Sequence, residues 1–387
     1  MQRDRCDVAV LGGGPAGLAA AIELRQRSAL EVVVVEPRQA PAERYGESLP
    51  PDILIALDRL GVSAAFRDDG HRPCPGSVSL WGSDRPGFND FILNPLGPGW
   101  HISRARFESM LRARAVACGV SLRTGARAVD STAADRGYEL TLRLAGGTRR
   151  ALRATWVVDA TGWPAWFARR QGAVRCAVDR KVAIVRFATV RAGAFTAQTV
   201  VEAAPDGWWY GAPLPGDQVV TAFVTLPQTA RDVIRDGHAG WRERLAGTRL
   251  LGSRLADCEL DHERFRAVAA PSGTLDRVEG RQWLAVGDAA AAYDPIAARG
   301  IHSALADARG AAAAILSELG LGTAPALGYA QQVEARFEDY LANRLALYAQ
   351  ERRWPDQEFW QTAVDAPAHL RATVPRRGGH RWAPASI

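Results

Sequence analysis

Closely spaced glycines near the start of the chain have the pattern of a phosphate-binding turn. Residues 7–11, Asp-Val-Ala-Val-Leu, are mostly apolar and run into Gly-Gly-Gly-Pro-Ala-Gly at 12–17, a G-x-G-x-x-G pattern. Its first glycine permits a tight turn, its second lets a pyrophosphate approach the backbone, and its third lets the helix pack closely on the strand. The free N–H groups of that helix favour negative charge. The residues predicted to hold a dinucleotide here are Gly12, Gly14, Pro15, Ala16 and Gly17.

The residues after the glycines strengthen this prediction. Residues 18–27 favour a helix, and residues 31–36, Glu-Val-Val-Val-Val-Glu, favour a buried strand that ends at Glu36. A carboxylate about 20 residues beyond the glycines accepts hydrogen bonds from the adenosine ribose. A glycine turn with an incidental acid is the alternative, and the complete order of strand, helix, strand and acid argues against it.

A second segment predicted to bind the dinucleotide lies in the C-terminal part of the chain. Residues 281–288 form a predicted strand that ends in Gly287-Asp288, and an Asp-Pro-Ile-Ala-Ala-Arg-Gly-Ile segment at 294–301 precedes an alanine-rich helix. The arrangement resembles the flavoprotein family whose type member is p-hydroxybenzoate hydroxylase. The resemblance implies FAD as cofactor, with Asp288 on the ribityl chain and Pro295, Gly300 and Ile301 along the flavin ring. A helix N-terminus there would stabilise negative charge on reduced flavin.

The resemblance extends to two arginines and to the order of the domains. Arg44 and Arg104 match positions that contact FAD phosphates or neighbouring groups in relatives, although exposed surface arginines are the alternative. The implied fold class is α/β: a Rossmann-type FAD-binding domain (1–175 and 273–325) with an inserted antiparallel β-sheet substrate domain (176–272). A C-terminal helix and tail (326–387) follow, with a helical pattern that starts at Tyr329 and ends near 352–356.

The inserted segment carries candidate substrate contacts. Short β-rich runs separated by Pro-Asp-Gly and Pro-Gly-Asp turns predict antiparallel strands. Because side chains alternate along a strand, at most Trp208 and Tyr210 of the Trp208-Trp209-Tyr210 run share one face. Both rings could face an aromatic substrate, and core packing is an equally good explanation.

Two further residues are weak candidates for catalysis. His302 follows Gly300-Ile301 and could donate to a flavin oxygen or act as an acid or base near neutral pH. A histidine with a purely local hydrogen bond at a helix start is the alternative. Glu47, in Gly46-Glu47-Ser48, could point into the active site, or it could be an ordinary acid of a first helical turn.

Within the family, the Gly-Glu-Ser-Leu-Pro-Pro and Trp-Trp-Tyr-Gly-Ala-Pro segments resemble the tryptophan-halogenase branch. They are closer still to flavoproteins that mature tryptophylquinone cofactors of amine dehydrogenases and amino-acid oxidases. A halogenase would carry a lysine near Ile55, a W-x-W-x-I-P segment, and a glutamate in the 294–301 loop, where this chain has Ala297. None of these is intact, and the single lysine, Lys181, lies elsewhere. Halogenation is therefore disfavoured.

The remaining chemistry is that of an FAD-dependent monooxygenase. The resemblance implies that reduced FAD forms a C4a-hydroperoxide with oxygen and hydroxylates an indole or tryptophan, free or held in a protein or peptide during quinone cofactor biogenesis. Alternatives from other classes are a reductase of prenyl double bonds and a non-catalytic flavoprotein that chaperones a partner subunit. There is no second G-x-G-x-x-G, so electrons come from transiently bound NAD(P)H or from a separate reductase.

Composition limits the partners. The net charge of +6 is spread over 48 basic residues, all but one of them arginine, without a basic run, so no nucleic-acid partner is expected. The five cysteines are widely spaced and lack a C-x-x-C pair, which predicts reduced thiols and no metal site. Because neither a signal peptide nor an apolar span of about 18 residues is present, we expect no membrane association and a cytoplasmic location.

Overall fold

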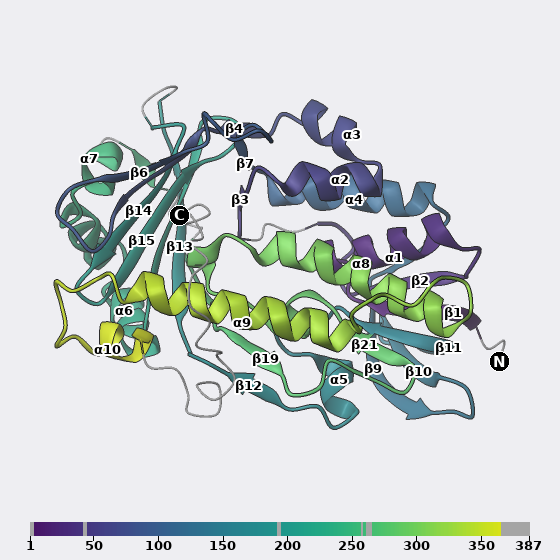
Figure 1. Cartoon of the computed structure of the whole chain (residues 1–387). Helices are drawn as coiled ribbons and strands as arrows, with labels where there is room; N and C mark the ends of the chain where they lie inside the picture. The colour runs from purple at the N-terminus through teal and green to yellow at the C-terminus, as the bar shows by residue number, and fades with distance from the viewer. Residues whose placement is uncertain (1–3, 42–44, 192–194, 257, 261–264, 365–387) are drawn as a thin grey trace.

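The computed structural model describes residues 4–41, 45–191, 195–256, 258–260 and 265–364, and its first layer is a largely parallel sheet (Figure 1). Along this sheet the strands run in the order β20-β21-β11-β1-β2-β8, and all pairs from β21 to β8 are parallel. The bounds are β1 (Asp4–Leu11), β2 (Val32–Glu36), β8 (Ser121–Thr124), β11 (Arg149–Asp159), β20 (Glu279–Gly280) and β21 (Trp283–Ala285). When the five parallel strands are numbered by their order in the chain, their order across the sheet is 3-2-1-4-5, from β8 to β21. This is the arrangement of Rossmann folds, and it confirms the predicted fold class.

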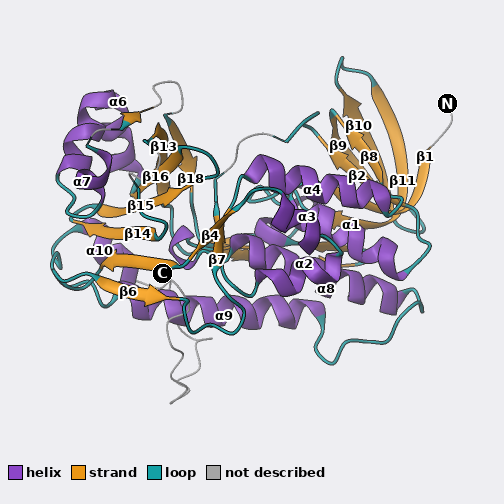
Figure 2. Ribbon diagram, turned by 90° about the horizontal axis from the view of Figure 1, so that it is seen from above, coloured by secondary structure: helices purple, strands orange, loops and turns teal. Residues whose placement is uncertain are grey.

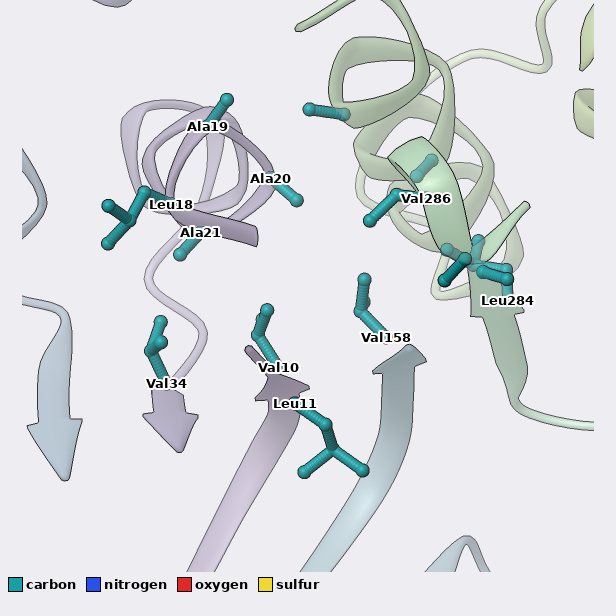
Figure 3. Packing of buried hydrophobic residues seen from close by; sticks show 14 of the residues in the cluster. Val10, Leu11, Leu18, Ala19, Ala20, Ala21, Val34, Val158, Leu284 and Val286 are labelled. Atoms are coloured by element: carbon teal, nitrogen blue, oxygen red, sulfur yellow. The ribbon is translucent and has the colours of Figure 1, made fainter. Parts of the chain in front are cut away.

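Helices gather on one face of this sheet (Figures 1 and 2). They are α1 (Pro15–Arg27), α2 (Ile53–Leu60), α3 (Ser63–Asp68), α4 (Arg104–Ala117) and α8 (Gly300–Glu318). Figure 3 shows Val10, Val34 and Val158 pointing from three adjacent strands toward the helix side, whereas Leu11 points to the opposite face. All four side chains are buried, which fits the apolar residues that these strands carry toward their carboxyl ends. The hairpin of β9 (Ala126–Ala133) and β10 (Tyr138–Leu144) extends the sheet beside β11.

A second, mostly antiparallel sheet forms the other half of the molecule. Its strands run in the order β17-β13-β16-β15-β14-β5-β6, with β18 also paired to β13. The bounds are β5 (Gly76–Leu80), β6 (Gly87–Asp90), β13 (Val182–Thr189), β14 (Thr199–Ala204), β15 (Gly207–Pro213), β16 (Gln218–Thr225), β17 (Glu259–Leu260) and β18 (Arg266–Ala269). Most of the sheet comes from the predicted insertion 176–272. However, β5 and β6 come from the preceding segment, and β5 pairs with β14 in parallel.

The two faces of this second sheet have different neighbours. One face packs against α6 (Pro227–Ala246) and α7 (Leu251–Leu255), which lie beside the sheet in Figures 1 and 2, through Trp209, Phe223 and Trp241. The other face carries Val185, Trp208 and smaller apolar side chains and looks toward the Rossmann half. The alternation predicted for the aromatic run is confirmed, because Trp208 and Trp209 lie on opposite faces.

Short strands join the halves. One small sheet has the order β3-β7-β4 and the other the order β12-β19-β22. Their bounds are β3 (Ser48–Leu49), β4 (Arg72–Cys74), β7 (Gly99–His101), β12 (Arg175–Ala177), β19 (Gly273–Leu275) and β22 (Ala291–Ala292). Other short elements are α5 (Trp166–Arg170) and the 3₁₀ turns η1 (Gly287–Ala289) and η2 (Pro295–Ala297).

A long C-terminal helix crosses both halves. Helix α9 (Tyr329–Tyr348) extends from the Rossmann half to the second sheet in Figure 1 and is followed by α10 (Glu358–Val364). Phe337, Tyr340 and Tyr348 are buried, so these aromatic side chains of the helix belong to the core. The helix ends a few residues before the predicted 352–356; the Glu351 carboxylate there accepts from the N–H groups of Gly82 and Arg353. The tail 365–387 lies outside the described residues.

Among the described helices, none is long and apolar enough to span a membrane.

Candidate flavin and substrate site

A cavity of about 590 Å³ lies between the two halves. The volume is within the range of about 300–1,000 Å³ that is usual for ligand pockets. On the Rossmann side its wall is formed by the glycine turn and by two loops from the C-terminal part of the domain. On the other side the wall is the inner face of the second sheet. The lining includes Gly14, Pro15, Ala16, Asp288, Pro295, Gly300 and Ile301 from the first side and Ala183, Val185, Trp208, Tyr210, Val220, Ala222 and Val224 from the second.

The glycine turn is fixed by close approaches of the backbone. Gly12 has φ +115°, and a Cβ there would lie 2.2 Å from the carbonyl oxygen of Ala160, at the end of β11. A Cβ on Gly17 would lie 2.0 Å from the carbonyl oxygen of Gly12. Since neither contact can relax by side-chain movement, both positions require glycine, as the pattern predicts.

The late aspartate turn lies against the glycine turn. Gly287 has φ +60°, and a Cβ there would lie 2.7 Å from the Cβ of Ala16. The Gly287 N–H donates to Asp307 Oδ2 over 3.0 Å, and the other oxygen of Asp307 accepts from Arg336 over 2.6 Å. Burial raises the pKa of Asp307 to about 6. The two segments that were predicted to share one dinucleotide are therefore neighbours in space.

Two helices begin at the cavity without a side-chain cap. The N-cap residue of α1 is Gly14, and that of α8 is Arg299; neither position provides a side-chain hydrogen bond to its helix. Gly14 and Gly300 both line the cavity. Uncapped N–H groups and the positive dipole end of a helix suit phosphates and other anionic groups. Asp288 is exposed in the same cavity, where its carboxylate can accept from hydroxyl groups.

Glu36 is held by the glycine turn itself. Its Oε2 accepts from the Gly13 N–H over 2.7 Å, and its Oε1 accepts from the Arg38 N–H over 3.0 Å. The side chain is buried at the end of β2 and is not part of the cavity wall, whereas Arg38 is. The sequence analysis missed Arg38; its signal was a basic residue two positions after the strand-end acid.

Buried charged side chains hold the loop that follows β22 in place. Asp294 is fully buried, and its Oδ2 lies 2.5 Å from Lys181 Nζ and accepts from the Tyr348 hydroxyl over 2.9 Å. Its Oδ1 accepts from the Ile296 N–H over 3.0 Å. Lys181 and Arg344 lower the pKa of Asp294, outweighing its burial. The only lysine of the chain thus holds the Asp-Pro loop in place.

Of the two predicted arginines, one reaches the site. Arg104 lines the cavity; its Nη2 donates to Glu108 Oε1 over 2.9 Å, and its Nη1 donates to the Tyr45 carbonyl. It thereby fixes the segment around Gly46 as well as offering positive charge to the cavity. Arg44 lies outside the described residues.

Trp208 and Tyr210 both line the cavity, as one of the two predicted possibilities requires. The Trp208 indole N–H donates to the Tyr348 hydroxyl over 2.9 Å, and the hydroxyls of Tyr210 and Ser48 are hydrogen-bonded at 2.7 Å. Both residues also line a smaller cavity of about 50 Å³ that adjoins the first, together with Ser48, Thr199 and Phe91. Thr199 accepts or donates a hydrogen bond with His101 Nε2 at 2.9 Å. Burial lowers the pKa of His101 to about 3.

The two weak catalytic candidates have different surroundings. Glu47 is buried and lines the larger cavity. His302 is not part of its wall; Nε2 of its ring lies 3.2 Å from Asp52 Oδ2, and this hydrogen bond holds the pKa of Asp52 below its usual range. The ring therefore pairs with the N-cap residue of α2, which is distant in the sequence rather than local to the start of α8, and a catalytic role for His302 stays a prediction.

Comparison with known proteins identifies the family. A family model described as "FAD binding domain" matches residues 5–336. This chain belongs to the FAD binding domain family. It is 26% identical over 360 residues to "Putative FAD-dependent oxidoreductase LodB" of Marinomonas mediterranea, covering 92% of this chain and 96% of the relative. It is also 27% identical over 347 residues to "Flavin-dependent halogenase armH3" of Armillaria mellea, covering 81% of this chain and 68% of the relative.

Solved structures give the same result. The flavin-dependent halogenase CmlS superposes with a TM-score of 0.82 at 25% identity, covering 95% of this chain and 69% of that one. "Peptidyl tryptophan dihydroxylase QhpG essential for tryptophylquinone cofactor biogenesis" superposes with a TM-score of 0.70 at 25% identity, covering 93% and 78%. The chain is accordingly an FAD-dependent oxidoreductase, and its relatives include monooxygenases and halogenases.

The residues present fit FAD. The glycine turn and the α1 N-terminus suit its pyrophosphate, Asp288 suits its ribityl hydroxyls, and the α8 N-terminus suits the electron-rich end of its flavin ring. In the described part of the chain, no cluster of three or more metal-binding side chains is present.

Proposed function

We propose that this protein is an FAD-dependent monooxygenase that hydroxylates the indole ring of a tryptophan held in a protein or peptide, as a step in quinone cofactor biogenesis. The observation that carries the proposal is a single cavity with two unlike walls: loops suited to FAD on one side and an apolar sheet face with aromatic rings on the other. Bound FAD, once reduced, would activate oxygen and supply the oxygen atom.

The sheet face has the properties that such a reaction needs. The side chains of Ala183, Val185 and Val220 offer no hydrogen bonds, so this wall excludes water from the reacting ring. Tyr210 adds a flat surface on which an indole could stack, at about 0.5–1.5 kcal/mol per aromatic pair, and Trp208, which is only 1% exposed, supports this part of the wall. Both rings are held by hydrogen bonds, which keeps the stacking surface in one orientation.

A group of exposed apolar side chains beside the cavity supports a macromolecular substrate. Phe91 lines the smaller cavity, and the residues around it are exposed: Phe88 by 68%, Ile92 by 88% and Leu93 by 91%. Phe88 lies in β6, the edge strand of the second sheet in the described structure, and Ile92 and Leu93 follow that strand. Exposed apolar groups of this kind mark binding sites for other proteins or peptides. A polypeptide around the target tryptophan could cover them while its indole enters the cavity.

The relatives support the same substrate class. QhpG is named a peptidyl tryptophan dihydroxylase, and its structure superposes on 93% of this chain. The halogenases are a weaker guide to chemistry, because the position expected for their lysine is Ile55, a half-exposed residue of α2 that does not line the cavity. We therefore place hydroxylation before halogenation.

The test starts with purified protein carrying FAD. Its flavin is reduced with dithionite under nitrogen, mixed with oxygenated buffer, and incubated with free tryptophan or with a synthetic peptide that contains one tryptophan. We expect a mass gain of one or two oxygen atoms on the peptide, and ¹⁸O₂ should label it. Chloride or bromide in place of oxygen in the product would make the enzyme a halogenase.

The same assay separates the other candidates. Saturation of a prenyl double bond under nitrogen would indicate the reductase, and FAD that exchanges freely without any turnover would indicate a chaperone. Replacing dithionite by NADH, by NADPH, or by either with an added flavin reductase identifies the electron source. Turnover with the nicotinamide alone would mean that the chain accepts hydride directly.

A further inference from the structure

We infer that Glu47 is a catalytic residue, the group that accepts the ring proton when the indole is hydroxylated. The inference rests on the proposed function, because only an aromatic hydroxylation releases such a proton. It is carried by the position of the carboxyl group and by its unused hydrogen-bonding capacity.

The backbone of Glu47 is fixed at the wall of the cavity. Its carbonyl accepts from the Ile102 N–H over 2.8 Å, and the next residue, Ser48, begins β3 and pairs with His101 of β7. The segment Gly46-Glu47-Ser48 lines the larger cavity, and Ser48 also lines the smaller one. Glu47 therefore directly precedes Ser48, which lines both cavities, as does Tyr210.

The carboxyl group itself is only half satisfied. Oε2 accepts from the Gly46 N–H over 3.0 Å, whereas Oε1 is buried and has no hydrogen-bond partner among the described residues. The residue as a whole is 4% exposed. A buried oxygen without a partner costs about 1–3 kcal/mol, so a bound molecule that supplies a proton there would be favoured.

Two other buried carboxylates in this chain, which hold backbone segments in place, accept more hydrogen bonds from backbone N–H groups. Glu202 accepts from three consecutive backbone N–H groups, those of Arg249, Leu250 and Leu251. Asp159 accepts from the N–H groups of Thr161, Phe167 and Ala168 with both of its oxygens. Oε1 of Glu47 has no such bond in the described structure, although Glu47 lines the larger cavity, which argues against a purely structural role.

The charges around Glu47 leave it able to change protonation near neutral pH. Burial raises the pKa of Glu47 to about 7, and Arg104 of α4 opposes the rise only in part. Arg104 is bonded to Glu108 and to the Tyr45 carbonyl instead of to Glu47. Tyr210 of β15 is close enough to interact electrostatically with Glu47, and the wall of the cavity also carries Arg38, Asp288 and Arg299.

The proton balance gives Glu47 a defined task. Oxygen and two-electron-reduced FAD are consumed, one oxygen atom leaves as water, and the other forms a C–O bond to a ring carbon. The C–H bond at that carbon then breaks, its electron pair restores the aromatic ring, and the proton passes to the Glu47 carboxylate. The carboxylic acid loses this proton to solvent after product release. Positioned acid–base groups contribute about 10²–10⁴-fold in rate.

The test compares wild-type protein with Glu47→Gln, which keeps the size of the side chain and removes the proton acceptor. We expect the rate of hydroxylation of the tryptophan peptide in single-turnover experiments to fall by about 100-fold or more. FAD affinity, measured by flavin fluorescence, should stay close to that of the wild type. A Glu47→Gln variant with the wild-type rate would overturn the inference.

A matched control tests whether the loss of rate comes from Glu47 itself or from the removal of any buried carboxyl group. Glu23→Gln removes another buried carboxyl group, on α1 and outside both cavities, and should leave the rate unchanged. Glu47→Asp should restore part of the rate. An equal loss in Glu23→Gln would also count against a catalytic role for Glu47.

The wild-type protein gives a second readout that needs no variant to fold. Because the carboxylate form is the acceptor, the rate of hydroxylation should rise with pH through about 7, while oxygen consumption by the reduced flavin stays level. A flat rate across this range would overturn the inference even if the proposed function holds. Wild-type protein that hydroxylates neither tryptophan nor the peptide would remove the proposed function, and this inference with it.

Discussion

The FAD side and the sheet side of the cavity are built in different ways. On the FAD side, the backbone at Gly12, Gly17 and Gly287 approaches other backbone or Cβ atoms so closely that no side chain fits. On the sheet side, the wall consists of side chains from strands that are far apart in the sequence. The first arrangement tolerates no added atom, whereas the second can be altered one side chain at a time. The cofactor site should therefore fail completely on substitution and the substrate site gradually.

The largest effect is expected on the FAD side. Gly12→Ala places a Cβ 2.2 Å from the Ala160 carbonyl oxygen at φ +115°, so the turn must move. We expect loss of FAD binding, by about 100-fold or more, because the turn and the α1 N-terminus set the phosphate site together. Flavin absorbance of the purified protein measures it. Gly328→Ala, at a position with ordinary φ and no close neighbour, is the control and should retain FAD.

The next largest effect is expected on the free energy of unfolding, at the buried ion pair that holds the Asp-Pro loop between the two sides. Lys181→Met leaves Asp294 buried without its closest cation and should lower the free energy of unfolding by about 3–5 kcal/mol. Urea unfolding followed by tryptophan fluorescence measures it. Arg235→Met, which breaks an exposed pair with Asp232, should cost less than about 1 kcal/mol. Similar losses in the two variants would contradict the anchoring role.

A pair of neighbouring tryptophans compares the two faces of the second sheet directly. Trp209→Ala should lower the free energy of unfolding by about 3–5 kcal/mol, because its ring packs against Phe223 and Trp241. At a temperature where both variants are folded, Trp208→Ala should lower the hydroxylation rate more than Trp209→Ala does. The comparison uses thermal unfolding and the single-turnover assay together. The reverse order of rates would mean that the cavity face does not hold the substrate.

The smallest effect is expected at the exposed group beside the cavity. Ile92→Asp should raise the KM for a tryptophan peptide with apolar neighbours by about tenfold, about 1.4 kcal/mol, and leave free tryptophan unaffected. The residue is 88% exposed, so folding should not change. Val174→Asp, at another exposed apolar position, is the control. Equal values for the two substrates would argue for a free small molecule.

Much of the FAD side could be predicted because its signals are local. The glycine pattern, the strand-end acid and the Gly-Asp turn each lie within a few residues, and their conformations depend on sterics between neighbours. Glu36 illustrates the limit of that approach. Its position at the end of β2 was predicted, yet its carboxylate is occupied by the N–H group of Gly13 in the turn and by that of Arg38 just after the strand.

The sheet side depended on contacts that no local pattern contains. The sequence by itself determined that Trp208 and Tyr210 share a face, because strand geometry alternates side chains. Only the tertiary structure decided that this face borders the cavity, that β5 and β6 join the sheet, and that Lys181 reaches Asp294. It likewise left Glu47 with an unpaired oxygen at the wall and turned His302 toward Asp52. The burial and pairing of these side chains arise when segments that are distant in the sequence pack together, so the amino-acid sequence read locally does not determine them.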